Sequence, residues 1–131
     1  MKNRMMAGKE MTQSLEDYLE AIYVLIADGK AAGVSDVAKM LRVKMPSVVK
    51  AVRELKRMEL VVQEPYSPIA VTAKGRRVAK LVLARHTLLR EFLLKLGVSR
   101  RTADRDACLM EHILSAETLE KIRTFTEDKK K

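Results

Sequence analysis

The 131-residue chain has one cysteine, three prolines, no tryptophan and no run of eighteen apolar residues. A single cysteine cannot form an internal disulfide, which favours a reducing compartment. Without a long apolar run, no helix is expected to span a membrane. The basic segment Met1–Lys9 also lacks the apolar stretch of a signal peptide. We therefore expect a cytoplasmic protein with no membrane partner.

The chain has an excess of positive charge, and that excess is unevenly placed. The net charge is +9, and residues 39–80 hold eleven Lys and Arg against three Glu, a net charge of +8. Such a segment is either a solvated surface or a surface for nucleic acid, because duplex phosphates favour clustered cations through counterion release. With 47% hydrophobic and 33% charged residues, the chain is expected to be folded and rich in helices.

The basic segment carries a pattern typical of a helix-turn-helix. A short helix over residues 36–41, capped by Ser35, is expected to end in a three-residue turn. Pro46 then lies in the first turn of a second helix that extends to about Met58. The alternative is an ordinary helical hairpin.

Two short β-prone runs follow the second helix, at residues 60–64 and 69–72, with Pro65-Tyr66-Ser67-Pro68 between them. Two strands directly after the second helix favour a winged helix-turn-helix over the hairpin. Three more helices are expected, over residues 74–95, 101–114 and 116–125. The first and last of these have more apolar residues than one face of a monomer needs, which predicts a homodimer.

A candidate metal site lies near the only cysteine. On a helix, Cys108, Glu111 and His112 have the spacing i, i+3, i+4 and project from one face. A thiolate, a carboxylate and an imidazole on one apolar-flanked face can hold a divalent transition metal. The alternative is a core cysteine, a surface glutamate and a histidine with an ordinary hydrogen-bond partner.

Two other helical segments carry comparable polar residues. In the first helix, which Thr12 or Ser14 is expected to cap, Asp17 and Glu20 share a face. The second histidine, His86, lies within an otherwise apolar helical run. The core stripe of the first helix is expected to consist of Leu15, Leu19, Ile22, Tyr23 and Ile26.

The segments SLEDYLEAIYVL, ARHTLLREFL and DACLMEHILS occur in this order. In sequence and spacing they resemble the diphtheria-toxin-repressor family of metal-dependent transcriptional regulators, and most closely its short manganese-regulator (MntR-like) branch. The resemblance extends from about Thr12 to about Asp128. It implies a homodimeric repressor in which Mn(II) or Fe(II) promotes binding to palindromic double-stranded operator DNA that controls metal homeostasis. An SH3-like third domain, present in some members, is expected to be absent because the chain ends at residue 131.

The resemblance also implies metal ligands. They are Asp17, Glu20, His86, Cys108, Glu111 and His112. In the family, Asp17, Glu111 and His112 form one site, while Glu20 and His86 help to form a second. Cys108 stands where the manganese branch has a bridging Glu, and Arg90 stands where the iron branch has a Glu. The thiolate favours Fe(II), Co(II) or Zn(II), the last two expected in vitro, whereas the carboxylates and imidazoles suit Mn(II) or Fe(II).

The second helix of the helix-turn-helix is expected to read DNA with its N-terminal end, which enters the major groove. The residues expected to reach base edges, away from the Val48, Val52 and Leu55 stripe, are Pro46, Ser47, Lys50 and Ala51. The residues expected to contact phosphates are Lys44, Arg53 and Arg57.

Two rival functions are a winged-helix regulator that does not sense metal and a metalloenzyme. The enzyme is disfavoured because no further acid, base or nucleophile is placed near the candidate ligands, and we expect no small-molecule substrate. The fold class predicted is mainly α, with an N-terminal winged helix-turn-helix and two-stranded β wing followed by a helical dimerisation domain. The expected divisions are a flexible arm (1–11), a DNA-binding domain (12–73), a metal-binding and dimerisation domain (74–128) and a disordered tail (129–131).

Overall fold

The computed structural model describes residues 12–129, which divide into two compact units. The N-terminal unit comprises residues 12–80 and the C-terminal unit comprises residues 81–129. The predicted arm and positions 130–131 of the predicted tail lie outside the described residues. Lys129, which was expected to belong to the tail, is the last residue of a helix.

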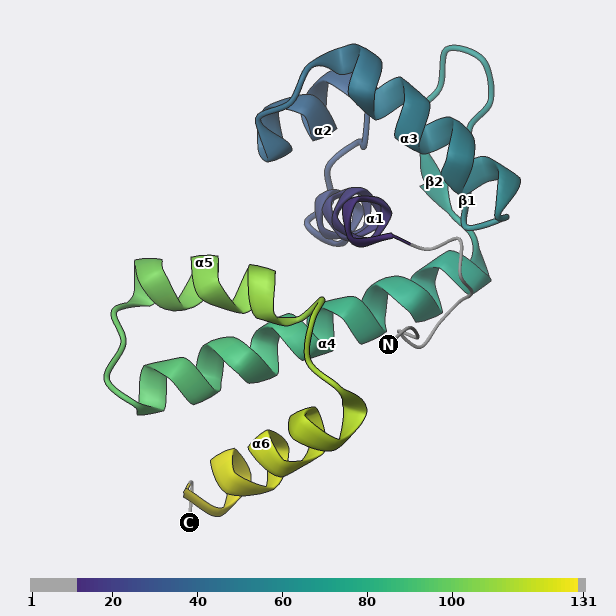
Figure 1. The fold of residues 1–131 in the computed structure, drawn as a ribbon. Coiled ribbons are helices and arrows are strands. Elements are labelled where there is room, and N and C mark those ends of the chain that lie inside the picture. Colours follow the sequence, from purple (N-terminus) through teal and green to yellow (C-terminus); the bar gives the residue numbers. More distant parts are fainter. Residues whose placement is uncertain (1–11, 130–131) are drawn as a thin grey trace. The chain divides into compact units, whose positions relative to one another are not determined.

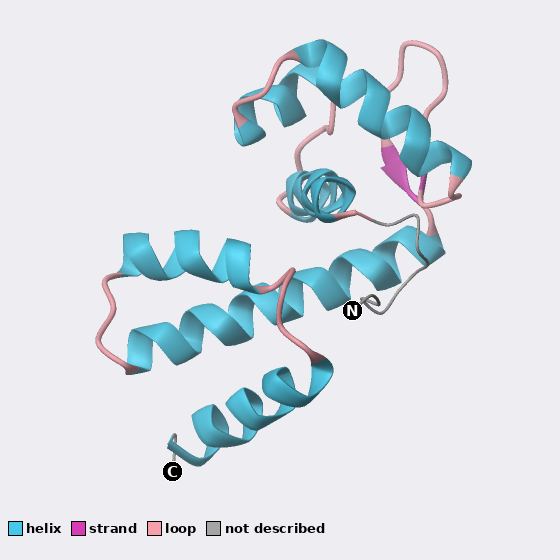
Figure 2. Cartoon of the chain, in the orientation of Figure 1, coloured by secondary structure: helices cyan, strands magenta, loops and turns pink. Residues whose placement is uncertain are grey.

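The N-terminal unit is a winged helix-turn-helix, which confirms the predicted fold class (Figures 1 and 2). Its two strands are antiparallel, with Val61 opposite Val71 and Val62 opposite Ala70. The elements that lie wholly in this unit are α1 (Gln13–Ala27), α2 (Val34–Leu41), α3 (Met45–Arg57), β1 (Val61–Val62) and β2 (Ala70–Val71). The following helix, α4 (Ala73–Lys95), begins in this unit and continues in the C-terminal unit.

Side-chain caps explain where the first helices begin. Thr12 caps α1, because its Oγ1 accepts a hydrogen bond from the Leu15 N–H at 3.1 Å. The expectation that Ser35 caps α2 is wrong. Gly33 is the N-cap, and its N–H donates to the Asp36 carboxylate at 3.0 Å. Arg42, with a left-handed φ of 59°, ends α2 and forms the tight turn before α3.

Two expectations about the core of this unit are corrected. Ile26 is 38% exposed, whereas Tyr18 and Leu25 of α1 are buried, so the apolar stripe is rotated toward those residues. Ala51 was expected to reach DNA, but it is only 5% exposed and packs in the core. Position 51 lies three residues after Val48 and four before Leu55, so it shares their helix face.

A close approach between the wing and α4 requires glycine at position 75. A Cβ there would lie 2.0 Å from the Leu60 carbonyl oxygen, a distance that no real side chain occupies. Thr72 fixes the same junction, because its hydroxyl donates to the Glu59 carbonyl at 2.7 Å and accepts from the Gly75 N–H at 2.9 Å. These hydrogen bonds connect the start of the wing to the start of α4.

The C-terminal unit is helical and consists of the rest of α4, α5 (Arg100–Met110) and α6 (Ala116–Lys129). Its core contains Leu89, Leu93, Ala103 and Ala107. The helix expected over residues 101–114 ends at Met110, so Glu111 is its C-cap and His112 lies in the turn that follows. None of the described helices is both long and apolar enough to span a membrane.

Candidate metal centre and DNA-binding surface

A buried carboxylate with an imidazole on each side lies in the C-terminal unit. The Nδ1 of His86, on α4, lies 3.2 Å from Oε1 of Glu111 at the end of α5. The Nε2 of His112, the next residue, lies 3.4 Å from Oε2 of the same carboxylate. The side chain of Glu111 is fully buried, and those of His86 and His112 are 17% and 1% exposed.

The end of α5 creates this arrangement. The Glu111 N–H still donates to the Ala107 carbonyl, at 3.0 Å, so the helical turn persists to Glu111. The His112 N–H donates to the Leu109 carbonyl at 3.4 Å, which is the tighter i to i−3 pattern that ends many helices. At this helix end, the adjacent residues Glu111 and His112 direct a carboxylate and an imidazole toward each other.

The chemistry of this cluster fits a divalent metal ion. Among the residues that the structure describes, neither oxygen of Glu111 accepts a hydrogen bond. A buried carboxylate in that position is costly unless a cation compensates it. Protons on the imidazoles or a divalent ion can supply that charge. Ligand atoms at right angles on an ion with bonds of about 2.1 Å are about 3 Å apart, close to the observed separations.

A second carboxylate lies on the other side of His86. The Nε2 of His86 is 3.7 Å from Oδ1 of Asp104 on α5. The same Asp104 oxygen accepts a hydrogen bond from Arg90 Nη1 at 3.2 Å. Asp104 is not among the ligands predicted from the sequence. The available signal was spacing, because Asp104 precedes Glu111 by two helical turns and Arg90 follows His86 by one.

The remaining predicted ligands are divided between the two units. Asp17 and Glu20 lie on α1 in the N-terminal unit, where both are half-buried. The neighbouring Glu16, which is not among the predicted ligands, is only 1% exposed. Cys108 is half-buried on α5. Within the part of the chain that the structure describes, it belongs to no group of three potential ligand atoms lying within 4.8 Å of one another.

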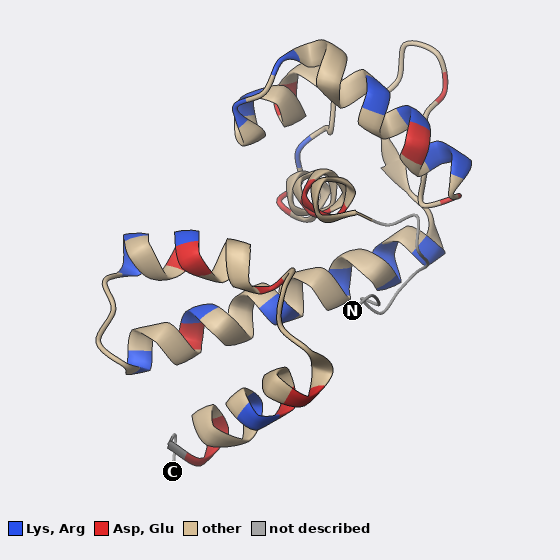
Figure 3. Cartoon of the chain, viewed as in Figure 1, with Lys and Arg blue, Asp and Glu red and all other residues tan. Residues whose placement is uncertain are grey.

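The exposed face of α3 carries most of the predicted DNA contacts. Figure 3 shows basic residues along α3, and the acidic residue among them in the sequence is Glu54. The predicted contact residues that are exposed are Lys44, Pro46, Ser47, Lys50, Arg53 and Arg57. They lie on or beside the face of α3 that is turned away from the core, so DNA can approach these side chains directly.

Glu54 modifies the charge of this face. Its carboxylate accepts a hydrogen bond from the Arg57 guanidinium at 2.6 Å, and both side chains are exposed. This hydrogen bond and the charge of Arg57 lower the pKa of the Glu54 carboxyl below its usual range. The carboxylate is therefore ionised at neutral pH and partly offsets the positive charge of Arg57.

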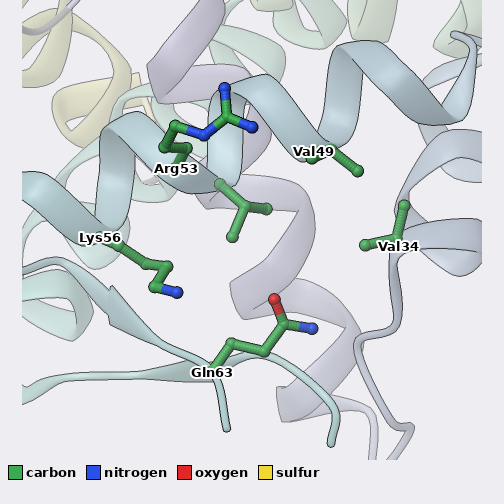
Figure 4. Close-up of a pocket in the computed structure, with 6 residues that line it drawn as sticks. Val34, Val49, Arg53, Lys56 and Gln63 are labelled. Atoms are coloured by element: carbon green, nitrogen blue, oxygen red, sulfur yellow. The ribbon is translucent and has the colours of Figure 1, made fainter. Parts of the chain in front are cut away.

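A shallow pocket lies beside α3 (Figure 4). Val34 of α2 with Val49 and Val52 of α3 make its apolar wall. Arg53 and Lys56 add positive charge, and Gln63, directly after β1, adds an amide. The pocket places Lys56, which has no assigned DNA contact, beside Arg53.

Two family models match the chain in succession. Residues 10–69 match the iron dependent repressor N-terminal DNA-binding domain. Residues 72–131 match the iron dependent repressor metal-binding and dimerisation domain. Nearly all of the chain is thus covered.

Similar proteins agree with these models. An uncharacterised HTH-type transcriptional regulator of Methanocaldococcus jannaschii is 40% identical over 119 residues, which cover 89% of this chain and 95% of that protein. The HTH-type transcriptional regulator MntR of Geobacillus kaustophilus is 40% identical over 124 residues, covering 92% and 88%. The structure of the manganese regulator SloR is 27% identical, with a TM-score of 0.78 over 89% of this chain. This chain spans only 55% of that structure.

Proposed function

The chain belongs to the iron-dependent repressor family, and we propose that it is a transcriptional repressor whose DNA binding depends on a divalent metal ion. One observation carries this proposal. The fully buried Glu111 carboxylate faces two imidazoles and accepts no hydrogen bond among the described residues. The same chain exposes a basic helix of a winged helix-turn-helix.

The resemblance to the family assigns ligands to α1 as well as to the C-terminal helices. In that pattern His112 and Glu111 would hold an ion with Asp17, and His86 would help to hold a second with Glu20. Because each oxygen of Glu111 faces a different imidazole, this one carboxylate can serve two ions. When bound, the ion supplies the positive charge that the buried carboxylate needs. An ion would favour the conformations of the chain in which its ligands meet. If these are also the conformations that bind DNA, metal binding promotes DNA binding.

Mn(II) or Fe(II) is the resident metal that this set of carboxylates and imidazoles suits. The similarity to proteins named as manganese regulators supports Mn(II). The family resemblance places Cys108 among the ligands, where its thiolate would increase affinity for Fe(II), and in vitro for Co(II) and Zn(II).

The DNA-binding surface is the exposed face of α3. Pro46, Ser47 and Lys50 near its N-terminal end read base edges in the major groove. The sequence-independent part of the affinity comes from phosphate contacts, made by Lys44, Arg53 and Arg57.

The functional unit is a homodimer on a palindromic operator. Large apolar side chains of the C-terminal unit are exposed, with Leu96 at 60%, Leu109 at 55% and Ile113 at 74%. A two-fold dimer covers such surface and pairs two recognition helices with two half-sites. A cytoplasmic location remains a prediction from the single cysteine.

The rival functions are less well supported. A winged-helix regulator that ignores metal gives the buried Glu111 carboxylate and the two imidazoles beside it no role, and the family model that matches residues 72–131 describes a metal-binding domain. A metalloenzyme leaves the exposed basic face of α3 without a role, and the family is one of transcriptional regulators.

The test begins with selection of bound sequences from a random duplex library by the Mn(II)-loaded protein. Fluorescence anisotropy then gives the affinity for the selected site with Mn(II) and with a chelator. The wild type should lose affinity at least tenfold in the chelator, and Glu111→Gln should bind weakly in both. The matched control is Asp106→Asn on α5, which should behave like the wild type. Equal affinity with Mn(II) and with chelator would instead support the regulator that ignores metal.

A further inference from the structure

The His86 ring lies between two carboxylates of the C-terminal unit. Its Nδ1 is 3.2 Å from Oε1 of Glu111, and its Nε2 is 3.7 Å from Oδ1 of Asp104. Asp104 is in turn held by Arg90, whose Nη1 donates to the same oxygen at 3.2 Å. The side chains therefore form a continuous series from Arg90 through Asp104 and His86 to Glu111.

Helix geometry brings these four side chains to facing positions on α4 and α5. His86 and Arg90 are four residues apart on α4, so both project from one face. Asp104 of α5 and Glu111, its C-cap, are seven residues apart, which again places them on one face. Between these helices, Leu89 of α4 and the small residues Ala103 and Ala107 of α5 belong to one buried cluster. The four polar side chains are thus attached to a packed pair of helices rather than to loops.

We propose that Asp104, fixed by Arg90, is a positioning residue for the metal ligand His86. A neutral imidazole can bind an ion through one nitrogen only if the other nitrogen carries the proton. A carboxylate facing Nε2 stabilises the form with the proton on Nε2, which leaves Nδ1 to face Glu111 and the ion. The inference rests on the proposed function, because it assumes that His86 is a ligand.

The separation of 3.7 Å between Nε2 and Asp104 is longer than a hydrogen bond. The Nδ1 of His86 faces Glu111, and its Nε2 faces Asp104. If His86 held an ion through Nδ1, the proton would lie on Nε2, where the Asp104 carboxylate could accept it in a charge-assisted hydrogen bond.

Arg90 explains why Asp104 positions a ligand rather than binding an ion itself. The side chain of Asp104 is 45% exposed, so without a partner it would be free to turn toward solvent. The guanidinium fixes it, and its permanent positive charge repels a second cation at the same oxygen.

The experiment compares Asp104→Asn and Arg90→Gln with the wild type. The matched control is Asp106→Asn, which removes a carboxylate of similar exposure, 44%, from the same helix. Mn(II) affinity is measured from the electron paramagnetic resonance signal of free Mn(II). Asp104→Asn should weaken Mn(II) binding about tenfold or more, as losses of such partners of ligating histidines do. Arg90→Gln should weaken it less, and Asp106→Asn should have no effect.

Two further readouts separate positioning from a merely structural role. In the Zn(II)-loaded protein, long-range ¹H–¹⁵N spectra should show His86 protonated on Nε2, and Asp104→Asn should change that signal. In a His86→Ala background, Asp104→Asn should cause no further loss of affinity, because the two side chains act as one unit.

The outcomes distinguish this inference from the proposed function. If the wild type binds Mn(II) but Asp104→Asn matches Asp106→Asn in affinity and leaves the His86 spectrum unchanged, the positioning role is overturned and the metal sensor stands. A further loss in the His86→Ala background has the same meaning. A wild type that binds no metal overturns both.

Discussion

Glu111 is the residue on which the proposed function most depends. Its side chain is fully buried and faces His86 and His112. A buried carboxylate raises the free energy of the folded protein unless a cation lies beside it. Metal binding should therefore stabilise the fold, and removal of this one charge should remove that effect.

The first prediction concerns thermal stability. At an Mn(II) concentration one hundred times the dissociation constant, the free energy of unfolding should rise by about 2.7 kcal/mol. This corresponds to an increase of several degrees in melting temperature by circular dichroism. Glu111→Gln should lose the increase without being less stable in chelator, because it no longer buries a charge. Glu120→Gln, on the exposed surface of α6, is the control and should respond to Mn(II) as the wild type does.

The second prediction concerns Cys108. If its thiolate binds metal, the Co(II) complex should have an intense sulfur-to-metal charge-transfer band in the near ultraviolet, and Cys108→Ser should abolish that band and weaken binding. Cys108→Glu should also lose the band and shift activation of DNA binding toward Mn(II). If Co(II) gives no such band and Cys108→Ser binds every metal normally, Cys108 has only a packing role.

At the residue scale, sequence pattern identified side chains better than it identified their surroundings. Cys108, Glu111 and His112 were expected on one continuous helix, whereas α5 ends at Met110 and His112 lies in a turn. Asp104 went unnoticed because its partners, His86 and Arg90, are on another helix. Spacing within one helix can place Asp104 on the same face as Glu111, but it does not reveal the contact with His86 and Arg90 on the other helix.

At the scale of elements, α3 combines an apolar core face with an exposed basic face, and one ion pair adjusts its charge. The Nη2 of Arg57 lies 2.6 Å from Oε1 of Glu54. Because Arg57 lowers the pKa of Glu54, the carboxylate stays ionised down to more acidic pH than an isolated Glu. Acidification within the neutral range should therefore not release Arg57.

The third prediction follows from this pair. Glu54→Gln should remove the ion pair that competes with a phosphate for Arg57, and it should raise affinity severalfold for operator and random DNA alike. The slope of log K against log salt should become steeper by about 0.9, the value for one more phosphate contact. Glu117→Gln on α6 changes the net charge equally and should leave the slope unaltered. A Glu54→Gln protein with the wild-type slope would show that Arg57 does not contact phosphate.

Helices were easier to predict than their ends. The wing and all six helices follow from periodicity and turn residues. Thr12 caps α1 and Pro46 lies in the first turn of α3, as expected. The start of α2 was misplaced because the Asp36 carboxylate caps the backbone of Gly33. Ala51 was misassigned because its small side chain gives little hydrophobic signal, although its helix position makes it part of the core.

At the scale of the whole molecule, the fourth prediction concerns assembly. The metal-free protein should sediment as a dimer at micromolar concentration, because association covers apolar side chains that are exposed in the single chain. Replacing Leu96 and Leu109 together by Glu should shift the equilibrium toward monomer. Arg105→Glu, on the exposed side of α5, is the control. A wild-type protein that sediments as a monomer would contradict the dimer.

The central claim is that metal and DNA bind to one coupled system. Thermodynamic linkage requires each ligand to change the affinity of the other by the same factor. The most direct test is to measure the Mn(II) dissociation constant of the wild type with and without saturating operator, and the operator dissociation constant with and without saturating Mn(II). The two ratios should be equal, in the range of about 5- to 150-fold. Ratios of one in both measurements, with Mn(II) bound, would show that the ion does not control DNA binding.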